Sequence, residues 1–468
     1  MNLQKSAIRE IWLDIREAIA GTERDFTTTS LGKAIFILSV PMVLEMVMES
    51  VFAVVDIFFV SRLGANAVAT VGITESVMTI IYAVGGGLST ATTALVARRI
   101  GEKDSRKAGI AAFQAILLAF LVSTIISLPG VLYARSFMRL MGATDDMISE
   151  GFLYPAIMFG SSGIVMLLFI INAVFRSSGD AAVSMRVMWL ANIINLVLDP
   201  ILIFGFGPIP AMGIKGAAVA TVTGRSIAVI YQFYLLFKSH HRIHLTWSSV
   251  RFQPGIMASL LRVSVGGILQ NMISTSSWII LVRIIAASGA AALAGYTIAI
   301  RIVLFALLPA WGISNAAATL VGQNLGAGHP GRAERSVWIT SYINMVVMGM
   351  VSIFLVIFPD AFIRLFIQDS EVIRQGALSL QIISLGFIFY ALSMVMIQGF
   401  NGSGDTITPT IVNFICFWLV EIPLAWLLAN SLGLGLAGAS MAIVIAESLL
   451  AVIAWFLFRR GTWKERKI

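Results

Sequence analysis

The sequence has little charge and few of the side chains on which enzymes rely. Asp, Glu, Lys and Arg make up 12% of its 468 residues, about half of the share usual in soluble domains. Its one cysteine, Cys416, excludes an intrachain disulfide, and its four histidines all lie in polar segments. A buried His/Cys metal site therefore has no ligands, and no zinc-protease, serine-hydrolase or Walker A motif is present. These absences argue against an enzyme and against a resident cofactor.

What the sequence has instead is apolar residues, 58% of the total. They form continuous runs of roughly 20 or more residues, typical of helices that cross a bilayer, and they do not alternate as the strands of a β-barrel do. Twelve runs can be placed, at residues 34–60, 68–97, 109–133, 152–175, 183–205, 214–237, 257–286, 292–320, 336–358, 377–399, 409–430 and 435–458.

A long polar interruption at 238–256 divides these runs into six and six. We therefore predict an all-α polytopic membrane protein with 12 transmembrane helices in two six-helix bundles, at residues 34–237 and 257–458. A cytoplasmic linker joins the bundles at 238–256. A segment at 1–33 precedes them, and a basic tail follows at 459–468.

The N-terminal segment carries apolar residues at spacings of three and four between charged ones. This pattern predicts an amphipathic helix, which either lies on the membrane surface or packs as a solvated helix on the cytoplasmic part of the protein. The apolar positions are Ile8, Ile11, Trp12, Ile15 and Ile19.

The distribution of Lys and Arg predicts the orientation. With a cytoplasmic N-terminus, the inner segments hold 21 of the 32 Lys and Arg residues, the outer loops hold 6 and the spans hold 5. Because cytoplasmic loops are enriched in Lys and Arg, both termini are expected in the cytoplasm, in a multi-pass protein of the plasma membrane. The net charge of +8 is then a signal of topology, and the expected partner is the lipid bilayer rather than nucleic acid.

The two halves resemble each other at an offset of 225 residues. LGANAVA at 63–69 aligns with SGAAALA at 288–294, and the triplet SGD occurs at 178–180 and again at 403–405. Arg139-Leu140 aligns with Arg364-Leu365. Six spans per half give both halves the same orientation, so we predict a parallel repeat about an axis along the membrane normal. Such repeats place a substrate path at their interface.

Three acids share one stripe of the first span. At about 100° per residue, Glu49 lies about 40° around the helix from Glu45, and Asp56 lies about 20° back from Glu49. A carboxylate in hydrocarbon costs at least ~2.5–3.5 kcal/mol, so this stripe is expected to face the protein interior. Phe52 lies close to the same face, and acids beside an aromatic ring suit a cationic amphiphile.

The fifth span supplies polar partners. Asn192, Asn195 and Asp199 recur at steps of three and four, and Pro200 follows directly. Two neighbouring carboxylates would share a proton or a cation, so either H⁺ or Na⁺ suits the pair. The alternative for each polar residue is a hydrogen bond between helices. For substrate binding we predict Glu45, Glu49, Phe52, Met188 and Asn192.

The repeat predicts that ion coupling is asymmetric. At the offset of 225, Asp56 aligns with Leu281, and Asp199 aligns near Ile422. The second half keeps Glu421 and Glu447 in its spans, neither at a position equivalent to an acid of the first half. We therefore expect coupling to reside in residues 34–237.

The segment SVPMVLEMVMESVFAVVDIFFVSRLGANAVATVG at 39–72 resembles the first two helices of the multidrug and toxic compound extrusion (MATE) transporters. RSSGD at 176–180, NLVLDP at 195–200 and GAAVAT at 216–221 extend the resemblance over nearly the whole chain. It implies 12 helices in two pseudosymmetric bundles and the export of organic cations by alternating access in exchange for Na⁺ or H⁺.

The resemblance is strongest to the subgroup of the DNA-damage-inducible F proteins and their archaeal relatives, because the seventh and tenth spans lack the acids of the NorM type. It implies a polar coupling site at Asp56, Asn172, Asn195, Asp199 and Thr221, with a candidate Na⁺ site at Asp56, Asn195, Asp199 and Thr221. No cofactor besides the coupling ion is expected, and the protein is expected to be a monomer. The alternative function is a flippase for lipids or lipid-linked oligosaccharides of the same superfamily.

Overall fold

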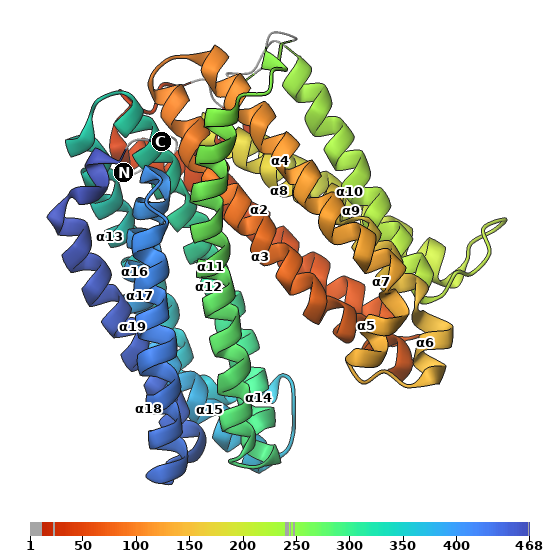
Figure 1. The fold of residues 1–468 in the computed structure, drawn as a ribbon. Helices are drawn as coiled ribbons and strands as arrows, with labels where there is room; N and C mark the ends of the chain where they lie inside the picture. The colour runs from red at the N-terminus through yellow and green to blue at the C-terminus, as the bar shows by residue number, and fades with distance from the viewer. Residues whose placement is uncertain (1–11, 22–23, 239–242, 244, 247–248, 467) are drawn as a thin grey trace. The chain divides into compact units, whose positions relative to one another are not determined.

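The computed structural model describes residues 12–21, 24–238, 243, 245–246, 249–466 and 468 (Figure 1). In this described part of the chain all regular structure is helical, apart from one isolated bridge between Phe206 and Ile209. The all-α prediction is therefore confirmed. The predicted amphipathic positions Ile8 and Ile11, and the histidines 240, 241 and 244, lie outside the described residues.

The first half of the chain forms nine labelled helices over the described residues. They are α2 (Leu31–Ser61), α3 (Ala65–Gly101), α4 (Ser105–Leu132), α5 (Ala134–Leu140), α6 (Asp145–Gly151), α7 (Leu153–Gly160), α8 (Ser162–Ser178), α9 (Ala181–Phe204) and α10 (Ile214–Phe237). The second half contains α11 (Pro254–Ala286), α12 (Ala290–Gly326), α13 (Pro330–Ile357), α14 (Pro359–Arg364), α15 (Ser370–Leu385), α16 (Phe387–Ser403), α17 (Ile407–Asn413), the π-helix η2 (Phe414–Glu421), α18 (Ile422–Trp426), the π-helix η3 (Leu427–Ser431), α19 (Gly435–Arg460) and the 3₁₀-helix η4 (Thr462–Glu465).

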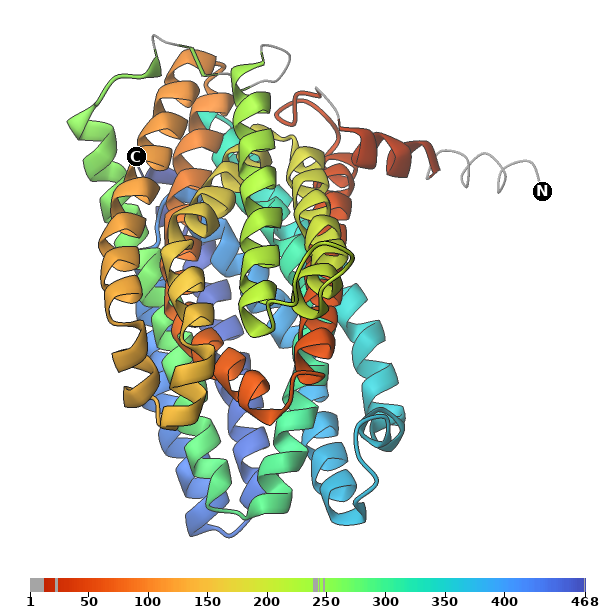
Figure 2. The same cartoon turned by 90° about the vertical axis from the view of Figure 1, so that its right-hand side faces the viewer.

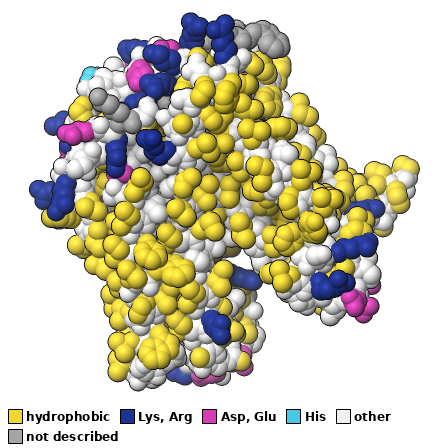
Figure 3. Space-filling model, in the orientation of Figure 1, with side chains coloured by type: hydrophobic (Ala, Val, Ile, Leu, Met, Phe, Trp, Pro, Cys, Tyr) yellow, Lys and Arg dark blue, Asp and Glu magenta, His cyan; other side chains and the backbone are white. Residues whose placement is uncertain are grey.

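Ten helical segments of the described chain are long and apolar enough to cross a membrane. The pair α15 and α16, bent by 52° at Gly386, makes an eleventh. The 31-residue α2 covers the first predicted apolar run. Figure 3 shows a face that is mostly hydrophobic, with Lys, Arg, Asp and Glu side chains gathered in a few groups, as expected of a chain that crosses a bilayer. Ten or eleven of the twelve predicted spans are thus found among the described residues, and the fourth, tenth and eleventh are each built from more than one helix.

The chain divides into two compact units. Unit 1 comprises residues 1–24 and 44–264, and unit 2 comprises residues 25–43 and 265–468. The boundaries therefore fall inside α2 and α11, the first long helix of each half, and not in the polar segments that the sequence suggested. The reason lies in local packing: within unit 2, the α12 residue Gly312 lies so close to Val43 that an added Cβ would meet the Val43 nitrogen at 2.8 Å.

The duplication is visible in element lengths and turn geometry. Helices α3 and α12 both have 37 residues, and α8 and α16 both have 17. Each of the latter two ends at a glycine of the SGD triplet in the left-handed region, Gly179 at φ 98° and Gly404 at φ 88°. Only glycine adopts this conformation without a steric cost. The glycines of the two triplets therefore end equivalent helices.

The repeat is broken at the fifth span. In unit 1 this span is the continuous α-helix α9, which runs through Pro200. Its counterpart in unit 2 is divided into α17, η2, α18 and η3, of which η2 and η3 are π-helical. A π-helical turn holds more residues than an α-helical one, so side chains after it face new directions.

The described residues near the two ends of the chain differ in how they pack. Residues 12–20 form a helix that runs across the direction of the long helices in Figure 2, with Trp12 66% exposed. The predicted basic tail is held on unit 2: Trp463 is fully buried and stacks on Phe458, and Arg466 forms a salt bridge with Asp405.

Candidate functional site

The polar site of unit 1 is built where α9 and α10 pack closely. An added Cβ on Gly224 would lie 2.5 Å from the carbonyl oxygen of Ala191, and one on Gly216 would lie 2.4 Å from that of Leu202. Two glycines two turns apart on α10 thus let the backbones approach, as small residues do between membrane helices. This close approach brings the side chains of Asn195 and Thr221 together.

Asn195 lies at the centre of the cluster. Its Nδ2 donates to Thr221 Oγ1 at 3.0 Å and to Asp199 Oδ1 at 3.3 Å. All three side chains are buried, Asp199 completely. The second carboxylate oxygen of Asp199, Oδ2, is buried and has no hydrogen-bond partner among the described residues. The structure therefore brings three of the four predicted Na⁺ ligands into one hydrogen-bonded group.

Asp56 is the fourth predicted ligand. Its carboxyl lies close enough to that of Asp199 for the two charges to interact, and its Oδ1 is buried without a hydrogen-bond partner among the described residues. No described residue forms a salt bridge with either aspartate. The arrangement offers two oxygen atoms, from α2 and α9, to a proton or a small cation.

Glu49 connects the acid stripe to the fifth span. Its Oε2 accepts a hydrogen bond from Asn192 Nδ2 at 3.2 Å, and its Oε1 lies 3.8 Å from Arg225 Nη2. The guanidinium of Arg225 also lies over the ring of Phe52, 5.9 Å from its centroid. Two of the predicted substrate residues therefore contact one arginine, and a third, Asn192, contacts Glu49. Met188 is half-buried on α9, one turn before Asn192.

Glu45 has a partner that the sequence did not suggest. Its Oε1 lies 2.9 Å from Arg176 Nη1, and both side chains are buried. In the sequence, Arg176 is one of the basic residues of the inner segments that indicate the topology. It lies 131 residues from Glu45, so no local pattern joins the two. An ion pair this well buried leaves Glu45 less able to attract a cationic substrate than the stripe suggested.

Asn172 lies apart from the Asp199 cluster. Its Oδ1 accepts from Gln232 Nε2 at 2.8 Å, and its backbone carbonyl accepts from Ser184. Gln232 follows Thr221 by eleven residues on α10, which is about 16 Å at 1.5 Å per residue. The structure therefore places Asn172 in a second polar contact of α8 and α10.

The tertiary structure assembles a further group of polar side chains around Arg225. Glu75 and Tyr82 of α3 lie close enough to interact electrostatically with this arginine, and Tyr154 of α7 lies close enough to interact with Asp56. Periodicity could not have found this group, because its members come from four helices.

Unit 2 holds a buried acid pair of its own. Glu421 of η2 accepts a hydrogen bond from Ser277 at 3.1 Å, and Glu447 of α19 accepts one from Ser393 at 3.3 Å. The two carboxyls are close enough to interact. The π-helix η2 carries Glu421, so the acid of unit 2 sits on the element at which the repeat is broken.

Comparison with known proteins decides the family. A family model described as MatE matches residues 41–201 and, again, residues 267–427. The chain belongs to the MATE family. The two matches begin 226 residues apart, within one residue of the offset that the sequence predicted, and MATE proteins are membrane transporters rather than enzymes.

Curated relatives extend over almost the whole MATE chain. It is 29% identical over 445 residues to a probable multidrug resistance protein NorM of Thermotoga maritima, covering 94% of each chain. It is 27% identical to an FAD transporter of Shewanella oneidensis, covering 92% of this chain and 95% of the relative. It is 24% identical to the multidrug export protein MepA of Staphylococcus aureus, covering 92% and 94%.

Solved structures share the fold. The chain matches a MOP superfamily transporter from Pyrococcus furiosus, for which a reversed polarity of the binding pocket suggests a different function, with a TM-score of 0.88 and 24% identity over 94% of this chain and 98% of that one. It matches the outward-facing conformation of a multidrug resistance MATE transporter with the same score, identity and coverage. The predicted architecture, a MATE fold with 12 helices, is therefore confirmed.

Proposed function

We propose that this MATE transporter exports cationic amphiphilic compounds by alternating access and that inward movement of H⁺ or Na⁺ drives the export. The coupling ion binds at Asp56, Asn195, Asp199 and Thr221. The substrate is held near Glu49, Phe52 and Asn192, where an acid, an amide and an aromatic ring meet.

One observation carries this proposal: Asp56 and Asp199 interact, and each has a buried oxygen without a hydrogen-bond partner among the described residues. Leaving a buried acceptor unsatisfied costs about 1–3 kcal/mol, and more when the group is charged. A proton or a cation removes that cost, so the two carboxyls attract the coupling ion. A substrate that moved the carboxyls would change their affinity for the ion, which is the requirement for coupled exchange.

The charge around the site favours a cationic substrate. Five carboxyl groups lie around the site. Two guanidinium groups, those of Arg176 and Arg225, offset part of their negative charge. Arg176 pairs with Glu45 and Arg225 with Glu49, which leaves Asp56, Glu75 and Asp199 uncompensated by a salt bridge. This negative excess disfavours a flavin dinucleotide, the cargo named for the Shewanella relative. It equally disfavours the anionic headgroup expected for a flippase.

The test is the efflux of ethidium, a fluorescent organic cation, from proteoliposomes. We impose a Na⁺ gradient alone, or a pH gradient alone, on wild-type protein and on Asp199→Asn. Wild type is expected to respond to one gradient. Asp199→Asn is expected to lose the response, a change of about 5- to 150-fold for a coupling of ordinary strength.

Two variants are matched controls. Asp145→Asn removes an exposed carboxylate of α6, 92% accessible, and should behave as wild type. Glu421→Gln neutralises the buried acid of unit 2 and should also retain ion-driven efflux if coupling resides in unit 1. Gradient-driven efflux by Asp199→Asn at the wild-type rate would overturn the proposal, and FAD export without ethidium export would overturn the substrate class.

A further inference from the structure

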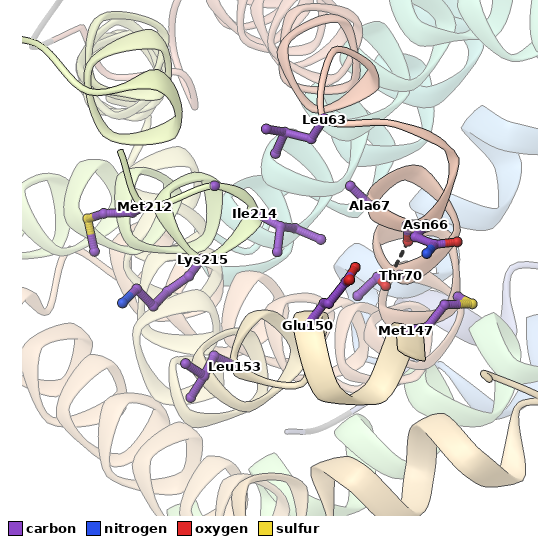
Figure 4. Close-up of a pocket in the computed structure, with 12 residues that line it drawn as sticks. Leu63, Asn66, Ala67, Thr70, Met147, Glu150, Leu153, Met212, Ile214 and Lys215 are labelled. Atoms are coloured by element: carbon purple, nitrogen blue, oxygen red, sulfur yellow. Dashed lines mark hydrogen bonds between the residues drawn. The ribbon is translucent and has the colours of Figure 1, made fainter. Parts of the chain in front are cut away.

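The lining of one cavity of unit 1 includes none of the groups that hold the substrate in the proposal. The cavity has a volume of about 380 Å³, and its walls come from α3, the segment from α6 to α7, and the start of α10. The loops that frame it carry residues that the Lys and Arg bias assigns to the outer side. Figure 4 shows its lining residues.

One carboxylate points into this cavity. In Figure 4 the side chain of Glu150 is directed towards Thr70 and Ile214, whereas the ammonium group of Lys215 points away from them. No described residue forms a salt bridge with Glu150. The Thr70 hydroxyl is buried and donates to the carbonyl oxygen of Asn66, so its own oxygen remains an acceptor. A carboxylate beside hydroxyl and carbonyl oxygens attracts a small cation.

Each wall of the cavity leads to the acid site within a few turns of helix. Along α3, Glu75 follows Thr70 by five residues, about 7.5 Å. Along α10, Thr221 follows Ile214 by seven residues, about 10 Å. At the floor, Met212 N donates to Leu202 O at 2.9 Å, and Leu202 lies one turn beyond Asp199 on α9.

The wall formed by α7 makes the most direct connection. Leu153 lines the cavity, and the next residue, Tyr154, is 3% exposed. The Tyr154 hydroxyl lies close enough to Asp56 and Glu75 to interact with both. Helix α7 therefore carries both a residue of the cavity wall and, at the next position, a buried polar group that interacts with the acids.

From these contacts we infer that the cavity is the entry through which the coupling cation reaches Asp56 and Asp199 from the outer side, with Glu150 as its first ligand. This inference rests on the proposed function, and it adds a route within unit 1 that is separate from the substrate's. The ligand is a small monovalent cation, Na⁺ or hydronium.

The first test removes the charge of Glu150. Glu150→Gln should raise the concentration of coupling cation at half-maximal efflux about fivefold, the effect of one unit charge at about 4 Å in water. The maximal rate and the binding of ethidium without a gradient should not change. The matched control is Asp146→Asn, which removes the same charge from the same helix outside the cavity.

The second test blocks the cavity. The only native cysteine, Cys416, is fully buried, so Ala67→Cys offers one reactive thiol in the cavity wall. A membrane-impermeant methanethiosulfonate added outside should label it and abolish ion-driven efflux while ethidium binding persists. Labelling of Asp146→Cys should leave efflux intact.

Three results would overturn the inference. They are an unchanged cation dependence in Glu150→Gln, a thiol at position 67 that does not react from outside, and complete labelling there with normal efflux. In each case the Asp199→Asn variant separates the two proposals. If this variant has lost ion-driven efflux, only the proposed entry route is wrong. If this variant keeps ion-driven efflux, the proposed coupling site itself is wrong.

Discussion

The buried ion pair of Glu45 and Arg176 allows a sharp prediction about stability. Its charged atoms are 2.9 Å apart, and the side chains are 4% and 14% exposed. Removing one partner of such a pair costs about 3–5 kcal/mol, because the remaining charge loses the attraction of that partner while it stays largely out of water. In a unit of this size, 1 kcal/mol shifts Tm by about 2–4 °C, so Glu45→Gln should lower Tm by roughly 6–20 °C.

Thermal unfolding in detergent, followed by the fluorescence of the ten tryptophans, measures this shift. Adding Arg176→Met to Glu45→Gln should recover part of the lost stability, since the second substitution removes the charge that has lost Glu45 as its partner. The double-mutant cycle gives the coupling energy of the two residues. If Glu45→Gln unfolds as wild type does but binds ethidium more weakly, the ion-pair argument is wrong and Glu45 belongs to the substrate site.

Two further predictions concern helix packing and capping. Gly224→Ala should destabilise the protein by about 1–3 kcal/mol and reduce ion-driven efflux, because the new Cβ would meet the Ala191 carbonyl at 2.5 Å. The control is Gly72→Ala, which should unfold as wild type does because nothing lies within 4 Å of the added Cβ. Asp104 caps α4, and the hydrogen bond from the Lys107 backbone holds the pKa of its carboxyl below the ordinary value. Its ionised form therefore adds a small stabilisation, present above pH ~4 and lost as the pH falls further. Asp104→Ala should cost about 1 kcal/mol, while Asp104→Asn should keep the cap and lose the pH dependence in unfolding measured from pH 3 to pH 7. Equal Tm values for the two glycine variants, or identical pH profiles for wild type and Asp104→Asn, would refute these arguments.

Some of the site could be predicted because helix geometry is local. Asn192, Asn195 and Asp199 recur at steps of three and four, and all three are buried in unit 1. The offset between the halves could also be predicted from the sequence, since the two SGD triplets end equivalent helices at Gly179 and Gly404. In both cases the information lies within one helix or one turn.

Other features could not be read in this way. The same periodicity that placed Glu45 on the acid stripe did not reveal Arg176, and the family resemblance that grouped Asn172 with Asp199 did not reveal Gln232. Each of these partners is set by which helices pack together and at what height they cross. The polar segment at 238–256 also suggested a boundary between the units, whereas the units divide within α2 and α11, and Val43 packs within unit 2.

Composition and periodicity alone determined that this chain spans a membrane with helices, that it is duplicated, and that carboxylates line one face of its first span. These properties follow from the transfer of side chains into lipid and from the fixed turn of an α-helix, which act on every residue regardless of distant ones. Only the tertiary structure decided which carboxylates form a salt bridge with an arginine and which do not. That difference depends on atoms a few ångströms apart in space and more than a hundred residues apart in the chain, and it separates the ion pair at Glu45 from the acids at Asp56 and Asp199.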